Sequence, residues 1–173
     1  MISQISYQPL ENLVQMVFEQ GSTPLYLILD GITDVRNFGA ISRTAECAGV
    51  HGIIIPVTGS AQINEEAVRT SAGALMRIPV CREKSLKAAA NHLKESGIML
   101  VAATEHAKEY CFNVSYPGPV AIIMGSEETG ISPELLRICD QMVKIPMQGE
   151  ISSLNVSVAA GVLLFEVVRQ RLA

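Results

Sequence analysis

The sequence predicts an α/β protein with a mostly parallel sheet and helices on both faces of that sheet. Short apolar runs that suit buried strands alternate along the chain with segments whose apolar residues recur at helical spacing, which is the order that gives a parallel sheet. The apolar residues are mostly Ala, Val, Ile and Leu, and the 173 residues include no Trp. The length suits one domain with a sizeable buried core.

The first half of the chain predicts three helices and two strands. Leu25–Asp30 is a continuous apolar run closed by an acid, which is typical of a strand buried on both faces. Gly21 ends the helix before this run, because glycine readily adopts the left-handed conformation that terminates many helices. The expected elements are helices over 9–20, 38–48 and 64–72 and strands over 25–30 and 52–56.

The second half of the chain continues the alternation. Ser132-Pro133 begins a helix well, because Ser can cap the first turn and Pro fits within it. The expected elements are a helix over 85–96, strands over 98–103, 120–124 and 142–145, a helix from Ser132, and a closing helix. This closing helix carries apolar side chains around most of its circumference, which predicts burial on most sides. Those side chains are Val158, Leu163, Leu164, Phe165, Val167 and Val168.

Composition and charge exclude several classes of protein. The formal net charge of −4 gives no overall attraction to nucleic acid, so contact with phosphate requires a local cluster of cations. Polar and acidic residues interrupt the first 20 positions, which excludes a signal-peptide core. The longest apolar run, residues 158–165, is too short to span a bilayer. We therefore expect a cytoplasmic protein that does not enter a membrane.

The four cysteines are spaced too widely for a metal site. Cys47, Cys81, Cys111 and Cys139 form no C-x-x-C pair, and the three histidines are scattered along the chain. We expect small core residues in a reducing compartment, and no bound metal.

Four loops that follow predicted strands are rich in Gly, Asn, Ser and charged residues. In open α/β sheets, ligands bind beyond the carboxyl ends of the strands, so these loops are expected to form the site. They are residues 30–39, 104–106, 125–130 and 147–155. Ser152, Ser153, Asn155 and Ser157 lie where the closing helix begins, and there the first N–H groups lack helical partners. These four residues either cap the helix or form a surface for a polar ligand.

Three common enzyme motifs are missing from the sequence. It contains no G-x-G-x-x-G after the first strand, no G-x-x-x-x-G-K-[ST] and no G-x-S-x-G. Gly125-x-Glu127-x-x-Gly130 has a Glu where a dinucleotide site needs its second Gly, so a pyrophosphate is disfavoured there.

Three longer motifs carry a more specific signal. They are Asn37-Phe-Gly-Ala-Ile-Ser-Arg43-Thr-Ala45, Gly125-Ser-Glu127-Glu-Thr-Gly130, and Ile145-Pro-Met147 followed by Ser153-Leu-Asn155-Val-Ser-Val-Ala159. Together they resemble the motifs of the SpoU/TrmH family of SPOUT methyltransferases, over about residues 25–170. We therefore divide the chain into a helical lead-in, residues 1–24, and a SPOUT catalytic domain, residues 25–173. The resemblance implies a C-terminal trefoil knot, S-adenosyl-L-methionine bound in the knotted loops, and a homodimer.

The resemblance also assigns roles to individual residues. The implied catalytic residues are Asn37, Arg43, Glu127, Ser153 and Asn155, and the implied cofactor-binding residues are Ala103, Thr104, Gly125, Ile145, Met147 and Leu154. Methyl transfer to a ribose 2′-hydroxyl requires that the hydroxyl be oriented in line with the methyl and lose its proton. Arg43 either accepts that proton or, because arginine stays protonated in almost any setting, clamps phosphate and stabilises the developing alkoxide.

Two features indicate a substrate: the basic residues, and the branch of the family that the chain resembles. Arg36, Arg43, Arg69 and Arg77 give the amino-terminal half a basic bias and form a candidate RNA-binding patch, with ordinary solvated charge as the alternative. Residues 70–80 and 165–171 are most similar to the branch that methylates guanosine in 23S ribosomal RNA, with transfer RNA as the second substrate. Two other functions stay open, an inactive RNA-binding or assembly module on the same scaffold and a small-molecule methyltransferase.

Overall fold

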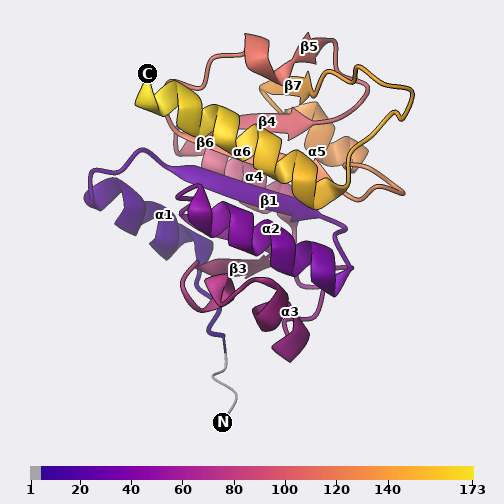
Figure 1. Ribbon diagram of the computed structural model, residues 1–173. Coiled ribbons are helices and arrows are strands. Elements are labelled where there is room, and N and C mark those ends of the chain that lie inside the picture. The colour runs from indigo at the N-terminus through magenta and orange to yellow at the C-terminus, as the bar shows by residue number, and fades with distance from the viewer. Residues whose placement is uncertain (1–4) are drawn as a thin grey trace.

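A computed structural model describes residues 5–173, and its centre is one sheet in which all paired strands run parallel (Figure 1). The order across the sheet is β3-β2-β1-β6-β4-β7-β5. The strands are β1 (Leu25–Asp30), β2 (Gly52–Pro56), β3 (Val80–Glu83), β4 (Met99–Ala103), β5 (Glu109–Tyr110), β6 (Val120–Gly125) and β7 (Gln141–Lys144). The predicted fold class, a mostly parallel α/β sheet, is confirmed.

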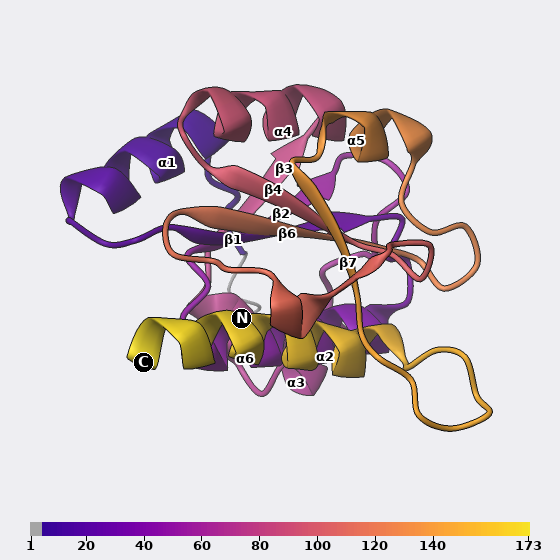
Figure 2. The ribbon, with the colours of Figure 1, turned by 90° about the horizontal axis from the view of Figure 1, so that it is seen from above.

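Helices cover both faces of the sheet, as expected. Figure 2 shows α1, α4 and α5 on one face and α2, α3 and α6 on the other. The helices are α1 (Leu10–Glu19), α2 (Val35–Cys47), α3 (Glu65–Thr70), α4 (Leu86–Glu95), α5 (Pro133–Ile138) and α6 (Val156–Leu172), with short 3₁₀ turns η1 (Ala74–Met76) and η2 (Cys111–Asn113). Within residues 5–173, no helix combines the length and apolarity needed to cross a membrane.

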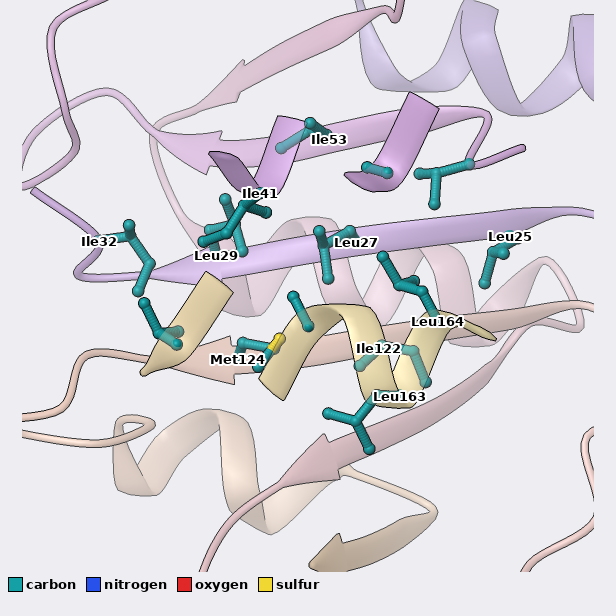
Figure 3. Close-up of a cluster of buried hydrophobic side chains, with 14 of the residues drawn as sticks. Leu25, Leu27, Leu29, Ile32, Ile41, Ile53, Ile122, Met124, Leu163 and Leu164 are labelled. Carbon is teal, nitrogen blue, oxygen red and sulfur yellow. The ribbon is translucent and has the colours of Figure 1, made fainter. Parts of the chain in front are cut away.

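The core lies on both sides of β1, because successive side chains of a strand point to opposite faces. Leu25, Leu27 and Leu29 pack under α2 and α6, beside side chains such as Leu164 (Figure 3). Tyr26 and Ile28, which alternate with them, pack under α1 and α4. Burying each large apolar side chain contributes about 1.5–3 kcal/mol, which explains why this run forms a central strand.

Three elements differ from the prediction: one helix starts earlier, and two strands were not expected. α2 begins at Val35 rather than near residue 38, because the Asp34 side chain accepts a hydrogen bond from the Asn37 backbone N–H and caps the helix. The strands β3 and β5 were not predicted. Both are short edge strands, and their pairing with β2 and β7 depends on residues far away in the sequence.

The prediction that α6 is buried on most sides was wrong. Val158 is 52% exposed and Phe165 46% exposed, whereas Leu163, Leu164 and Val167 are buried against the sheet and α2. α6 therefore packs through one face and leaves a second apolar face in solvent.

The carboxyl-terminal part of the chain is threaded. β7 lies between β4 and β5, although β4 and β5 follow one another in the sequence. The chain that leads from α5 on one face, through β7, to α6 on the other face therefore passes inside the loop formed by β4, residues 104–119 and β6 (Figure 2). This threading is the trefoil knot implied by the resemblance.

Candidate active site

A cavity of about 560 Å³ opens at the carboxyl ends of β4, β6 and β7, the sheet edge that was predicted to hold the site. Its walls come from the loops after these three strands and from the start of α6. All six expected cofactor residues line it: Ala103, Thr104, Gly125, Ile145, Met147 and Leu154. Glu127 and Ser153, two of the five expected catalytic residues, line it as well.

The loop after β6 is held tightly against the end of that strand. Gly130 donates its backbone N–H to the Ser126 carbonyl at 2.9 Å and has a φ of +67°, which glycine adopts without strain. A Cβ at Gly125 would lie 2.2 Å from the Gly130 carbonyl carbon and 2.4 Å from the Ile131 nitrogen. No side chain fits at Gly125, so the main chain of this loop forms the cavity wall.

Glu127 links this loop to the start of α6. Its Oε1 accepts a hydrogen bond from the Val156 backbone N–H at 3.0 Å, which is one of the N–H groups that α6 itself cannot pair. The positive end of the helix dipole also favours a carboxylate at this place. This hydrogen bond therefore connects Glu127 of the second motif to the third motif.

Asn155 joins the third motif to the first. Its Nδ2 donates to Asn37 Oδ1 at 3.1 Å, and its Oδ1 accepts the Ser157 N–H at 2.9 Å. Residues separated by 118 positions are thus in direct contact. The hydrogen bonds of Asn37, Glu127 and Asn155 bring all three motifs together at the start of α6.

Arg43 lies on the exposed face of α2, on the same side of the helix as Arg36, and does not line the cavity. Asn37 and Asn155 also lie outside the cavity lining, next to its α6 end. Within one protomer, the structure therefore groups the expected cofactor residues with Glu127 and Ser153, and leaves Arg43 facing solvent.

Sequence comparison identifies the family of this chain. The model of the SpoU rRNA methylase family matches residues 24–165, which include all three motifs. The chain belongs to the SpoU rRNA methylase family. A curated relative, the 23S rRNA (guanosine-2′-O-)-methyltransferase RlmB of Vibrio parahaemolyticus, is 43% identical over 163 residues. That match covers 94% of this chain and 66% of the relative, so the chain spans just under two thirds of that enzyme.

Solved structures of SpoU proteins share the fold. The SpoU methyltransferase AviRb from Streptomyces viridochromogenes, in complex with the cofactor AdoMet, has a TM-score of 0.81 at 33% identity, over 87% of this chain and 61% of AviRb. The A. aeolicus TrmH/SpoU tRNA modifying enzyme has a TM-score of 0.79 at 30% identity, over 94% of this chain and 84% of that one. The predicted family and its knotted fold are confirmed.

The four arginines expected to bind RNA come from three different segments of this SpoU protein. Arg36 and Arg43 are on α2, and Arg69 is on the neighbouring α3. Arg36 pairs with Glu66 at 3.2 Å across the two helices. Arg77 instead lines a second hollow of about 300 Å³ with His51 and Pro79, at the amino ends of β2 and β3. Arg36, Arg43 and Arg69 thus share two neighbouring helices on the face of the sheet that α6 covers, and Arg77 lies apart from these helices in the sequence of elements.

Several cavity residues were not predicted from the sequence. Tyr110 and Lys144 line the cavity, and the Lys144 ammonium lies 5.4 Å from the centre of the Tyr110 ring. Glu105 and His106, which also line it, do belong to the loop 104–106 that was expected to form the site. Tyr110 belongs to β5, a strand of two residues without a periodic pattern, so the sequence offered no signal for it.

The structure describes no cluster of metal ligands. Within residues 5–173, no group of three or more His, Cys, Asp or Glu side chains is placed to hold a metal ion. Burial raises the pKa of the Cys81 thiol to about 12 and that of the Cys139 thiol to about 11. Both thiols therefore stay protonated at neutral pH and are poor nucleophiles.

Proposed function

We propose that this chain is the catalytic domain of an S-adenosyl-L-methionine-dependent RNA methyltransferase that methylates the ribose 2′-hydroxyl of a guanosine in 23S ribosomal RNA. The observation that carries the proposal is the cavity itself, since all six expected cofactor residues line it and Glu127 and Ser153 lie at its wall. The names of the relatives, a guanosine-2′-O-methyltransferase among them, support this chemistry.

The cavity fits S-adenosyl-L-methionine in size and lining. Its volume of about 560 Å³ lies within the range of small-molecule sites. Ala103, Ile145, Met147 and Leu154 offer apolar surface for an adenine, and the main chain of the loop at Gly125 offers polar groups for a ribose. Bound there, the cofactor supplies a methyl group already activated by its sulfonium.

The residues around the cavity mouth must orient the acceptor hydroxyl and manage its proton. Asn37 and Asn155 are held to each other, so their amides form a fixed polar edge next to the cavity. Arg43 is exposed on the adjacent helix, where its guanidinium is free to reach RNA. A guanidinium that stays charged stabilises a developing alkoxide and a nearby phosphate, and this is the role we assign to it.

We also propose that the protein acts as a homodimer through the exposed face of α6. Val158, Phe165 and Leu172 are 52%, 46% and 82% exposed and recur every two turns on one side of this helix. Aligned exposed apolar side chains favour a self-complementary contact with a second copy. Because α6 packs beside α2, such a contact brings the partner subunit close to the exposed Arg43.

Sedimentation equilibrium tests the homodimer. Phe165→Asp on this face is expected to give a monomer, whereas Met16→Asp, which places the same charge on the 40% exposed Met16 of α1, is expected to leave the dimer intact. A wild-type monomer, or a Phe165→Asp dimer as stable as that of the wild type, would refute the proposed interface.

The RNA is proposed to lie across α2 and α3, where Arg36, Arg43 and Arg69 supply positive charge. A ribosomal RNA substrate places the protein in the cytoplasm. The test incubates the purified chain with tritiated S-adenosyl-L-methionine and in vitro transcripts of 23S ribosomal RNA, transfer RNA and 16S ribosomal RNA, followed by mapping of 2′-O-methyl groups.

Label in a guanosine of 23S RNA is the expected result of this test. Label in transfer RNA alone would show that transfer RNA is the substrate. The likeness to a tRNA modifying enzyme makes transfer RNA the second candidate. RNA binding without label in any transcript would indicate an inactive binding or assembly module and contradict the proposal.

A further inference from the structure

The last turns of α6 are hydrogen-bonded to the segment between η2 and β6, which is part of the loop through which the chain is threaded. The Gln170 side chain donates from Nε2 to the Val114 carbonyl at 2.8 Å, and its Oε1 accepts the Tyr116 backbone N–H at 2.7 Å. The Arg171 guanidinium donates to the Gly118 carbonyl at 3.1 Å. α6 thus holds the main chain of this segment at three alternate residues.

Glu166 fixes the orientation of the Gln170 amide. Glu166 is only 6% exposed, and Arg169 donates to both of its carboxylate oxygens at 2.9 Å. These hydrogen bonds lower the pKa of Glu166, so the carboxylate is ionised at neutral pH. An ionised carboxylate accepts but cannot donate, so the Gln170 Nε2 group must face Glu166 Oε1, at 3.0 Å, and the amide oxygen must face Tyr116.

A chain of contacts leads from this amide to the cavity. Tyr116 is 1% exposed, and its hydroxyl donates to the Cys111 carbonyl at 2.9 Å. Cys111 follows Tyr110, which lines the cavity and pairs with Lys144 of β7 in the sheet. The position of Tyr110 at the wall therefore depends on the segment that Gln170 holds.

We propose that Gln170 is a positioning residue for the donor cavity: by holding residues 114–116, it keeps the loop closed around β7 and sets the wall formed by Tyr110. Gln170 lies outside the cavity lining and acts through Tyr116 and Cys111. This inference rests on the proposed function of the cavity as the S-adenosyl-L-methionine site.

Three variants of the full chain test the proposal. Gln170→Leu removes both hydrogen bonds to the segment, and Tyr116→Phe removes only the hydroxyl that binds the Cys111 carbonyl. Gln15→Leu is the matched control, because within residues 5–173 the Gln15 side chain donates only to Glu19, on the surface of α1. The measurements are S-adenosyl-L-methionine affinity by calorimetry, hydrogen exchange by mass spectrometry, and separate KM values for the donor and the RNA.

We expect Gln170→Leu to raise the Kd and the KM for S-adenosyl-L-methionine about tenfold and Tyr116→Phe to raise them about threefold, since each lost bond removes a modest net interaction. Exchange is expected to accelerate in residues 111–118 and not in β1, and the KM for RNA is expected to stay unchanged. A merely structural role would instead raise exchange throughout the sheet.

The inference is overturned if both variants bind the donor as tightly as Gln15→Leu, or if exchange accelerates equally in the central strands. A wild-type protein that binds no S-adenosyl-L-methionine would refute the proposed function itself, so the two failures are distinguishable.

Discussion

One added methyl group, in Gly125→Ala, tests whether the loop after β6 shapes the cavity. The new Cβ would lie 2.2 Å from the Gly130 carbonyl carbon and 2.4 Å from both the Gly130 oxygen and the Ile131 nitrogen. Ordinary contact for a Cβ begins at 3.4 Å, so the loop must move by about 1 Å. All three atoms belong to the main chain, so no change of rotamer can relieve the clash.

The displacement has two expected consequences. Overpacking typically lowers the free energy of unfolding by 1–3 kcal/mol, and a clash with backbone alone places Gly125→Ala near about 3 kcal/mol. A wall moved by about 1 Å also spoils the fit of the donor, and misplacement of this size lowers binding or turnover roughly 10²-fold.

Urea unfolding and calorimetric titration with S-adenosyl-L-methionine measure these two effects separately. Gly149→Ala is the matched control, because a Cβ at Gly149 meets no atom of the described residues within 4 Å, and Gly149 lies in the loop between β7 and α6. Wild-type stability and wild-type donor affinity in Gly125→Ala would refute the assignment of this loop as a fixed wall of the cofactor site.

The remaining predictions concern the acceptor, the donor and the pH dependence of stability. Arg43→Ala is expected to lower turnover roughly 10²-fold with little change in donor affinity, because Arg43 lies outside the cavity; unchanged turnover would remove it from the mechanism. Leu154→Asp is expected to abolish donor binding in calorimetry, since it sets an unpaired charge against the adenine, whereas Ile151→Asp, at an 81% exposed position, is expected to bind normally; tight binding by Leu154→Asp would show that the pocket is misplaced. Hydrogen bonds from Arg169 lower the pKa of Glu166 below the usual 4.5, so its contribution to stability is present above pH 4.5 and is lost as the pH falls through the lower folded value. Urea unfolding should therefore show a smaller loss of stability on acidification in Glu166→Gln than in the wild type, and equal losses would contradict this reading.

The elements that the sequence predicted well are those whose signal is local. Leu25–Asp30 is apolar at every position but the last, and it became the central strand β1 because only a strand buried on both faces uses such a run. The start of α2 was placed three residues late, although Asp34 is a good N-cap and its side chain does cap the helix.

The elements that were missed depend on distant partners. β5 is two exposed residues that become a strand only because β7 is threaded beside them. No periodic pattern could show that threading, and the knot entered only through the resemblance of three motifs to a family. Tyr110 and Lys144 line the cavity because the same threading places β7 beside β5.

Two sequence-based expectations were made without knowledge of the packing. α6 has apolar side chains on most sides, but the protomer supplies a partner for one face only, so Val158 and Phe165 are exposed. Arg77 was grouped with Arg36, Arg43 and Arg69 by position in the sequence, yet the chain places it at the amino end of the sheet. A sequence bias in charge therefore does not locate a surface patch.

Replacement of a single sugar in the RNA is the most direct test of methyl transfer to a ribose hydroxyl. Once the modified guanosine is mapped, two RNA fragments are compared that differ only in ribose or 2′-deoxyribose at that nucleotide, with tritiated S-adenosyl-L-methionine as donor. The account predicts label in the ribose fragment and none in the deoxyribose fragment. Equal label in both fragments would show that the methyl group goes to the base, and would contradict it.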